Sequence, residues 1–192
     1  MPSVHESLNT PMTSPPRCDK AAHVLAPTIT SVSSAGLENA TNDIVSLWRL
    51  QARYADIITR RAWAELREVF LPETTVQIDT VTAPQRSLVG PDALGDFVST
   101  AIERFDHFTF VILNTVVDVE SPDHARGRIF MCEIRHDTAS DEWQVAHGCY
   151  QDRYQRVDDR WWFADRHYRS MARTGPDGAV FGLPAGLGPL GG

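Results

Sequence analysis

Hydrophobic residues in this chain recur first with the period of a helix and later with the period of a β-strand. Between residues 42 and 58 they form an amphipathic stripe with one polar interruption, Gln51. This spacing predicts a helix with Thr41 as its N-cap. A second short helix is expected over residues 63–70 and ends at Pro72, because proline lacks the N–H that a continuing helix needs.

Alternation of apolar and polar positions dominates the rest of the chain. Residues 74–81 are rich in β-branched side chains and predict a strand, and Gly90-Pro91-Asp92 opens a further helix. Four long alternating segments follow, separated by turn residues: 107–119, 126–136, 143–157 and 160–171. Such successive hairpins predict an α+β fold, a cone-shaped barrel of a strongly curved, mostly antiparallel sheet wrapped around N-terminal helices with one internal pocket.

Composition divides the 192 residues into one domain and two tails. Residues 1–38 are rich in Pro, Ser, Thr and Ala without an apolar period, which predicts a disordered leader. Residues 39–173 form the expected domain. The Gly- and Pro-rich residues 174–192 form a C-terminal tail that is expected either to lie across the pocket mouth or to be a frayed end.

Charge and cysteine usage narrow the class of protein. The net charge of −7 argues against nucleic-acid or membrane partners, which reward basic surfaces. The longest apolar run, residues 108–113, falls well short of the roughly 20 residues of a membrane span, and residues 1–26 lack the pattern of a signal peptide. Three cysteines without a CxxC motif, and no H-x-x-x-H pattern, favour a reduced cytoplasmic protein without a metal site.

Four motifs and their order carry a family resemblance. They are YADIITRRAWAELREVF at 54–70, LVGPDAL at 88–94, HGCYQDRYQR at 147–156 and RWWFADRHYR at 160–169. Together they resemble the SnoaL-like branch of the nuclear-transport-factor-2-like superfamily over roughly residues 41–173. That superfamily includes dehydratases, dehydrohalogenases, ketosteroid isomerases, cyclases and non-catalytic binding proteins, so the fold alone does not determine function.

The resemblance also implies where catalytic groups are expected. In the dehydratase and dehydrohalogenase relatives an Asp–His dyad abstracts a proton, and the corresponding positions here are Thr59 and Phe110. Neither side chain can act as a base near neutral pH. Tyr54, Tyr150 and Arg166 do match the pocket pattern of those relatives.

Side chains alternate between the two faces of a strand, so the position of Phe110 predicts which residues of the other strands face the same pocket. Its candidate catalytic groups are Tyr54, Arg166, Asp152, Glu133 and His107. The expected substrate-binding residues are mostly apolar and aromatic: Thr59, Trp63, Phe105, Phe108, Phe110, Ile112, Ile129, Met131, Ala146 and Tyr150.

Each candidate catalytic group has a functional and a structural interpretation. Arg166 could stabilise a developing oxyanion, or form a structural ion pair with Asp152 or Glu133. Tyr54 could donate to a substrate carbonyl, or contribute only its ring to the core. Either carboxylate could be a replacement base, since burial raises a carboxyl pKa, or lie near solvent at a strand end. His107 becomes a substitute imidazole only if a β-bulge turns it inward.

The leading functional hypothesis is an enzyme of the cyclase, isomerase or dehydratase type that needs no cofactor. Its expected substrate is a hydrophobic, oxygenated metabolite such as a polyketide, terpenoid or steroid-like compound of secondary metabolism. The alternatives are a non-catalytic binding protein of the same fold and the small subunit of a multi-component oxygenase. A homodimer or higher homo-oligomer is also expected, because Trp143, Val145, His147 and Cys149 would otherwise face water.

Overall fold

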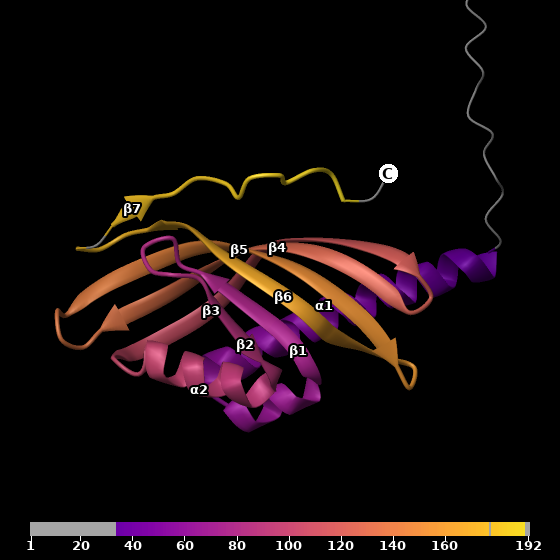
Figure 1. Cartoon of the computed structure of the whole chain (residues 1–192), viewed down its shortest axis with the longest axis horizontal. Coiled ribbons are helices and arrows are strands. Elements are labelled where there is room, and N and C mark those ends of the chain that lie inside the picture. The colour runs from indigo at the N-terminus through magenta and orange to yellow at the C-terminus, as the bar shows by residue number, and fades with distance from the viewer. Residues whose placement is uncertain (1–33, 177, 191–192) are drawn as a thin grey trace, which may run out of the picture. The chain divides into compact units, whose positions relative to one another are not determined.

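The computed structural model describes residues 34–176 and 178–190, with side chains from residue 38 onward, and Figure 1 shows their arrangement. The helices are α1 (Ser34–Arg60), the 3-10 helix η1 (Trp63–Glu68) and α2 (Gly90–Ile102). The strands are β1 (Phe70–Asp79), β2 (Arg86–Val89), β3 (Phe105–Ser121), β4 (His124–Asp137), β5 (Glu142–Val157), β6 (Arg160–Arg173) and β7 (Ala179–Val180). No helix in the described part of the chain is both long and apolar enough to cross a membrane.

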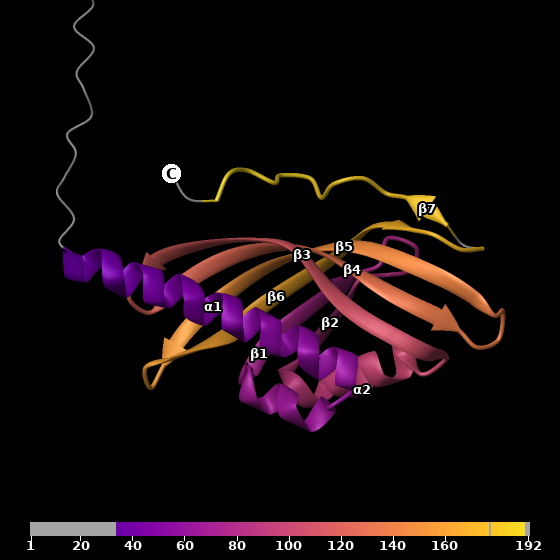
Figure 2. The same cartoon turned by 180° about the vertical axis from the view of Figure 1, so that it is seen from behind.

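The strands form one strongly curved sheet in the order β2-β1-β6-β5-β4-β3, with β7 added to β6. Neighbouring strands are antiparallel except β1 and β6, which run parallel. In the views of Figures 1 and 2, α1 and α2 lie on the concave side of the sheet. The predicted α+β fold with a curved, mostly antiparallel sheet around N-terminal helices is therefore confirmed.

The start of the first helix differs from the prediction. The helix begins at Ser34, so Thr41 lies inside it and is not its N-cap. Residues 34–38 accordingly belong to α1, whereas the expected leader over residues 1–33 lies outside the described residues. Residues 38–42 are exposed, so the apolar stripe from which the boundary was predicted does not extend to the start of the helix.

The second helix is also shorter than predicted. It ends at Glu68, and Phe70 already begins β1, so Pro72 lies within a strand and does not end the helix. The parallel pairing of β1 with β6 is interrupted between Phe70 and Thr75. A proline is tolerated there because no ladder hydrogen bond is required from its nitrogen.

The C-terminal tail packs on the outer face of the sheet, opposite α1 and α2, as Figure 2 shows. The Phe181 N–H donates to the Met171 carbonyl at 2.8 Å, and Arg128 donates to the Gly188 carbonyl. No described tail residue lines the internal pocket, but Thr174 and Pro176 line a neighbouring polar cavity that shares Arg135 and Arg173 with it. The expectation of a tail across the pocket mouth stays a prediction. Trp143 is 62% exposed, as expected for the outer face, but Cys149 is only 1% exposed, so the expectation that it faces water is wrong.

Candidate functional site

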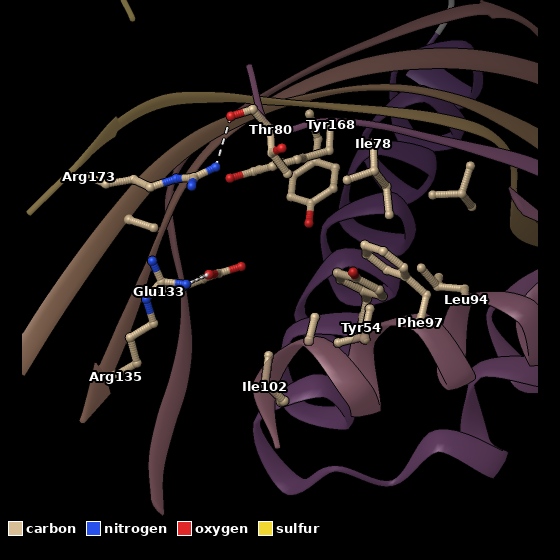
Figure 3. A pocket seen from close by; sticks show the side chains of 15 residues that line it. Tyr54, Ile78, Thr80, Leu94, Phe97, Ile102, Glu133, Arg135, Tyr168 and Arg173 are labelled. Atoms are coloured by element: carbon tan, nitrogen blue, oxygen red, sulfur yellow. Dashed lines mark hydrogen bonds and ion pairs between the residues drawn. The ribbon is translucent and has the colours of Figure 1, made fainter. Parts of the chain in front are cut away.

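An internal cavity of about 200 Å³ lies between α2, β1 and the inner faces of β4, β5 and β6 (Figure 3). Its apolar lining comprises Val76, Ile78, Leu94, Phe97, Val98, Ala101, Ile102 and Ala146. Its polar lining comprises Tyr54, Thr80, Glu133, Arg135, Tyr150, Tyr168 and Arg173. Figure 3 shows the separation: Leu94, Phe97 and Ile102 come from α2 on one side, and the charged groups come from the strands on the other.

Three tyrosines line the cavity wall. The ring centroids of Tyr150 and Tyr168 are 5.0 Å apart, and those of Tyr54 and Tyr150 are 6.3 Å apart. Gly148 makes room for this arrangement, because a Cβ there would lie 2.2 Å from the Tyr168 ring. Burial raises the pKa of all three hydroxyls, so they are neutral hydrogen-bond donors at physiological pH.

Glu133 is the carboxylate that reaches the cavity. Figure 3 shows its side chain pointing into the cavity from β4, and the side chain is 20% exposed. Burial raises the pKa of Glu133, and the positive charges of Arg135 and Arg173 oppose this rise. Its own charge in turn helps to raise the pKa of Tyr54, Tyr150 and Tyr168. The carboxylate therefore interacts with every tyrosine of the wall.

Two arginines stand beside Glu133 at one end of the cavity. Arg135 donates from Nη1 to Glu133 Oε2 at 3.3 Å, and its pKa is lowered mainly by burial. Arg173 donates from Nη2 to the Thr80 carbonyl at 2.9 Å and from Nε to the Ser170 hydroxyl at 3.3 Å. This end of the cavity thus carries two cations and one carboxylate.

Arg166 and Asp152 lie deeper in the protein and pair with each other. Arg166 Nε and Nη2 each donate to one Asp152 oxygen at 2.8 Å, and the two side chains are 1% and 0% exposed. Burial alone would lower the pKa of Arg166, but the charge and hydrogen bonds of Asp152 outweigh it and raise that pKa. Neither residue is part of the cavity lining.

The Arg166 guanidinium forms the support beneath the tyrosine wall. It lies 4.2 Å from the Tyr54 ring centroid and 4.3 Å from that of Tyr150, which are distances of cation–π interaction. Its positive charge lowers the pKa of Tyr54, opposing the larger effect of burial. Arg166 therefore acts on the cavity through the aromatic rings and does not reach the cavity itself.

Gln51 belongs to the same buried polar network. It donates to the Tyr154 hydroxyl and accepts from Thr115 Oγ1 at 3.0 Å. Tyr154 in turn donates to Asp152 Oδ2 at 2.9 Å. Gln51, the single polar interruption of the apolar stripe, thus connects α1 through Tyr154 to the Asp152–Arg166 pair.

The two positions that correspond to the family dyad lie side by side. The Phe110 N–H donates to Thr59 Oγ1 at 3.1 Å, and the Phe110 ring packs edge-on against Tyr54 at 5.5 Å. Both residues lie next to the tyrosine wall but outside the cavity lining. The two positions are therefore in direct contact, but neither side chain can act as a base.

His107 points away from the cavity. A register shift does occur between Phe105 and His107, but it leaves the histidine exposed, with its ring 5.0 Å from that of Trp143. The idea that a β-bulge turns this imidazole inward is therefore wrong. Because the bulge precedes His107, Phe108 and Phe110 keep the inward parity and His107 takes the outward one.

The remaining predicted residues divide between cavity and core. Among the expected substrate-binding side chains, Ala146 and Tyr150 line the cavity. The others pack in or against the hydrophobic core around it: Trp63, Phe105, Phe108, Phe110, Ile112, Ile129 and Met131. Thr59 binds the backbone of Phe110, as described above.

Arg135 and Arg173 were not predicted as site residues. Arg135 has the same strand parity as Glu133, two positions earlier, and that signal could have identified it. Arg173 was missed because of a β-bulge in β6. Gly148 pairs with Ser170, but Ala146 pairs with Arg173. The one extra residue in β6 turns Arg173 to the inner face, where simple alternation would place it on the outer face. A second register shift, between Arg153 and Tyr154, pairs Phe163 with Tyr154 and leaves Phe163 fully buried.

Comparison with known protein families identifies the fold family. A family model described as the SnoaL-like domain matches residues 39–167. The chain therefore belongs to the SnoaL-like domain family, as its motifs predicted. No curated protein matches the chain.

Solved structures share this fold at low sequence identity. A provisionally assigned scytalone dehydratase from Novosphingobium aromaticivorans has a TM-score of 0.66 and 20% identity, over 80% of this chain and 99% of that one. A hexachlorocyclohexane dehydrochlorinase (LinA type 2) has a TM-score of 0.65 and 14% identity, over 78% and 99%. A protein of unknown function from Mycobacterium tuberculosis has a TM-score of 0.61 and 20% identity, over 71% and 76%. The similar structures thus include proteins named as a dehydratase and a dehydrochlorinase.

Proposed function

We propose that this protein is a lyase or isomerase that needs no cofactor and acts on a hydrophobic, oxygenated small molecule, with Glu133 as the base. One observation carries the proposal. A carboxylate whose pKa is raised by burial points into an apolar cavity that is lined by three neutral tyrosine hydroxyls. Perturbed acids in clefts are typical of catalytic sites.

Glu133 meets the requirements of a general base. A carboxyl group with a raised pKa is a stronger base than an exposed one, and neighbouring arginines favour its ionised form. Arg135 and Arg173 supply that compensation here. In the proposed step Glu133 removes a proton from the carbon next to a carbonyl group, and the C–H electron pair forms the double bond of an enolate.

The tyrosines supply the complementary hydrogen bonds. The enolate oxygen gains negative charge as the proton leaves, and a neutral hydroxyl that donates to it stabilises the transition state. Tyr54 suits this role because the Arg166 charge and a hydrogen bond from Tyr150 both favour negative charge on its oxygen. Arg166 is thus proposed as a positioning residue that acts through Tyr54 and Tyr150.

The fate of the enolate defines the reaction class. Departure of a leaving group with its electron pair from the adjacent carbon gives an elimination, and return of the proton to another carbon gives an isomerisation. The names of the similar structures support elimination, since dehydration and dehydrochlorination both remove a proton and a leaving group from the substrate. The cavity of about 200 Å³ suits a ligand with one or two rings, since a cavity of about 150 Å³ takes up benzene.

Hydrogen–deuterium exchange tests the proposal without knowledge of the natural substrate. The wild-type protein is expected to accelerate exchange of the acidic protons of 2-tetralone, a bicyclic ketone, in D2O, as followed by ¹H NMR. The acceleration by E133Q is expected to be smaller than that by the wild type by about 10²- to 10⁴-fold, the usual contribution of a general base. E120Q, which alters a carboxylate on the surface beside Arg126, is the matched control.

Two outcomes contradict the proposal. Either E133Q exchanges the ketone as fast as the wild type, or the wild type shifts the ketone resonances on binding but does not exchange its protons. The second outcome favours a non-catalytic binding protein of the same fold. The observation that supports this alternative is the pair Thr59 and Phe110, which places no base at the positions of the family dyad.

A further inference from the structure

We propose that the ligand of this cavity is an amphipathic acid, whose carboxylate binds between Arg135 and Arg173 while its ring body occupies the apolar part of the cavity. This inference deepens the proposed function and rests on it for the identity of the site. Its basis is the uncompensated positive charge at one end of an otherwise apolar cavity.

Arg135 has hydrogen-bonding capacity left over. Its side chain is 15% exposed, its Nη1 binds Glu133, and its Nε is buried without a hydrogen-bond partner in the described part of the chain. The guanidinium otherwise lies 4.9 Å from the Phe105 ring centroid. A buried cation in this state is costly, and a bound anion would relieve that cost.

Arg173 is held by neutral groups. Its hydrogen bonds go to the Thr80 carbonyl, to Ser170 Oγ and to Thr82 Oγ1. Within residues 34–176 and 178–190 no carboxylate forms an ion pair with it. These contacts fix the guanidinium in place while its positive charge is not balanced by a direct partner, which is the arrangement of a preorganised anion site.

A second cavity borders the positively charged end of the first one. Beyond Arg135 and Arg173 a second, polar cavity of about 350 Å³ is lined by these two arginines together with Arg104 and Asp137. Arg104 Nε lies 3.2 Å from Asp137 Oδ2, so the charges of these two residues balance each other. The two arginines therefore stand at the boundary between an apolar cavity and a polar one, where the acid group of an amphipathic ligand would lie.

The charges balance when such a ligand binds. Glu133 in its ionised form and one ligand carboxylate carry two negative charges, which match the two guanidinium groups. Figure 3 shows Arg135, Arg173 and Glu133 on one side of the cavity, with Leu94 and Phe97 opposite. A neutral ligand would leave one cation uncompensated in this partly desolvated site.

A pair of isosteric probes tests this inference by binding alone. The wild-type protein is expected to bind 2-naphthoate at least about tenfold more tightly than 2-naphthamide in isothermal titration calorimetry, the scale of one charged hydrogen bond. R173Q is expected to abolish this preference while it leaves the affinity for 2-naphthamide unchanged. R173K, which keeps the charge, is expected to retain most of the preference, and R126Q, a surface change, is the control.

Three results would overturn the acid-binding inference. They are equal affinity of the wild type for the two probes, an unchanged preference in R173Q, and an equal loss of both affinities in R173Q, which would indicate altered packing. None of them bears on proton exchange by Glu133, because the calorimetry involves no reaction. Conversely, loss of exchange in the ketone assay leaves the preference between the two naphthalene probes unaffected.

Discussion

Thr59 Oγ1 accepts a hydrogen bond from the Phe110 N–H at 3.1 Å, so the two positions of the family dyad are joined through a backbone contact. The Thr59 hydroxyl thus binds the backbone and the Phe110 ring packs against Tyr54, so neither position carries a base. The proposed base is Glu133, which lines the cavity together with the three tyrosines.

The first prediction concerns the stabilising role of Thr59. T59V keeps the shape of the side chain but removes the acceptor of the Phe110 N–H, and we expect it to lower the free energy of unfolding by about 1 kcal/mol. T59S keeps the hydroxyl and is the matched control. Urea denaturation measures both, and equal stability of T59V and the wild type would contradict the role assigned to this hydrogen bond.

The second prediction concerns pH. Burial raises the pKa of Glu133, and the charges of Arg135 and Arg173 lower it again. A base must be ionised, so the exchange rate is expected to fall toward acid with a midpoint above about 4.3, the ordinary pKa of Glu. Removal of one cation weakens the opposition to the effect of burial, so R135Q is expected to move this midpoint upward. A midpoint that stays fixed or moves downward would mean that another group controls the rate.

The third prediction concerns Gly148. A methyl group there would lie 2.2 Å from the Tyr168 ring, so G148A is expected to displace this ring and cost about 1–3 kcal/mol of stability through overpacking. Binding of 2-naphthamide is expected to weaken as well, because Tyr168 lines the cavity. G188A, where nothing lies within 4 Å of the added carbon, is the control. Full stability of the double variant G148A/Y168L would confirm the steric cause.

The fourth prediction concerns the buried ion pair of Asp152 with Arg166. D152A leaves a buried guanidinium without its partner, so the free energy of unfolding is expected to fall by about 3–5 kcal/mol. D118A, which breaks the exposed pair with Arg126, is expected to cost about 1 kcal/mol or less. Chemical denaturation compares the two, and a similar small cost for both would show that the buried pair is not important for stability.

The fifth prediction concerns assembly. Trp143 is 62% exposed on the outer face, where its ring stacks against His107 and His136. A second copy is expected to cover it, so sedimentation equilibrium should give twice the chain mass of 21.4 kDa. W143E is expected to give the monomer mass, and V180E, an exposed change on β7, is the control. A monomeric wild type would contradict this expectation.

Local patterns predicted the elements and part of the cavity, and long-range packing decided the rest. Parity along β4 and β5 identified Glu133 and Tyr150, because those strands pair without interruption. Arg173 escaped prediction because a bulge on β6 is invisible in the alternation of apolar residues. The helical period indicates that Leu94 and Phe97 share the inward face of α2, but which strands they meet depends on how α2 docks on β1.

The parallel pairing of β1 with β6 has a consequence for biosynthesis. Asp79 and Arg169 bind each other across a sequence separation of 90 residues, so the inner edge of β1 has no partner until the last long strand is made. During translation β1 therefore lacks its partner β6 until the C-terminal hairpins have been made. Contacts of such long range are slow to form. The sheet is then expected to be completed only after translation has passed β6, and a chain that stops before residue 160 cannot complete it.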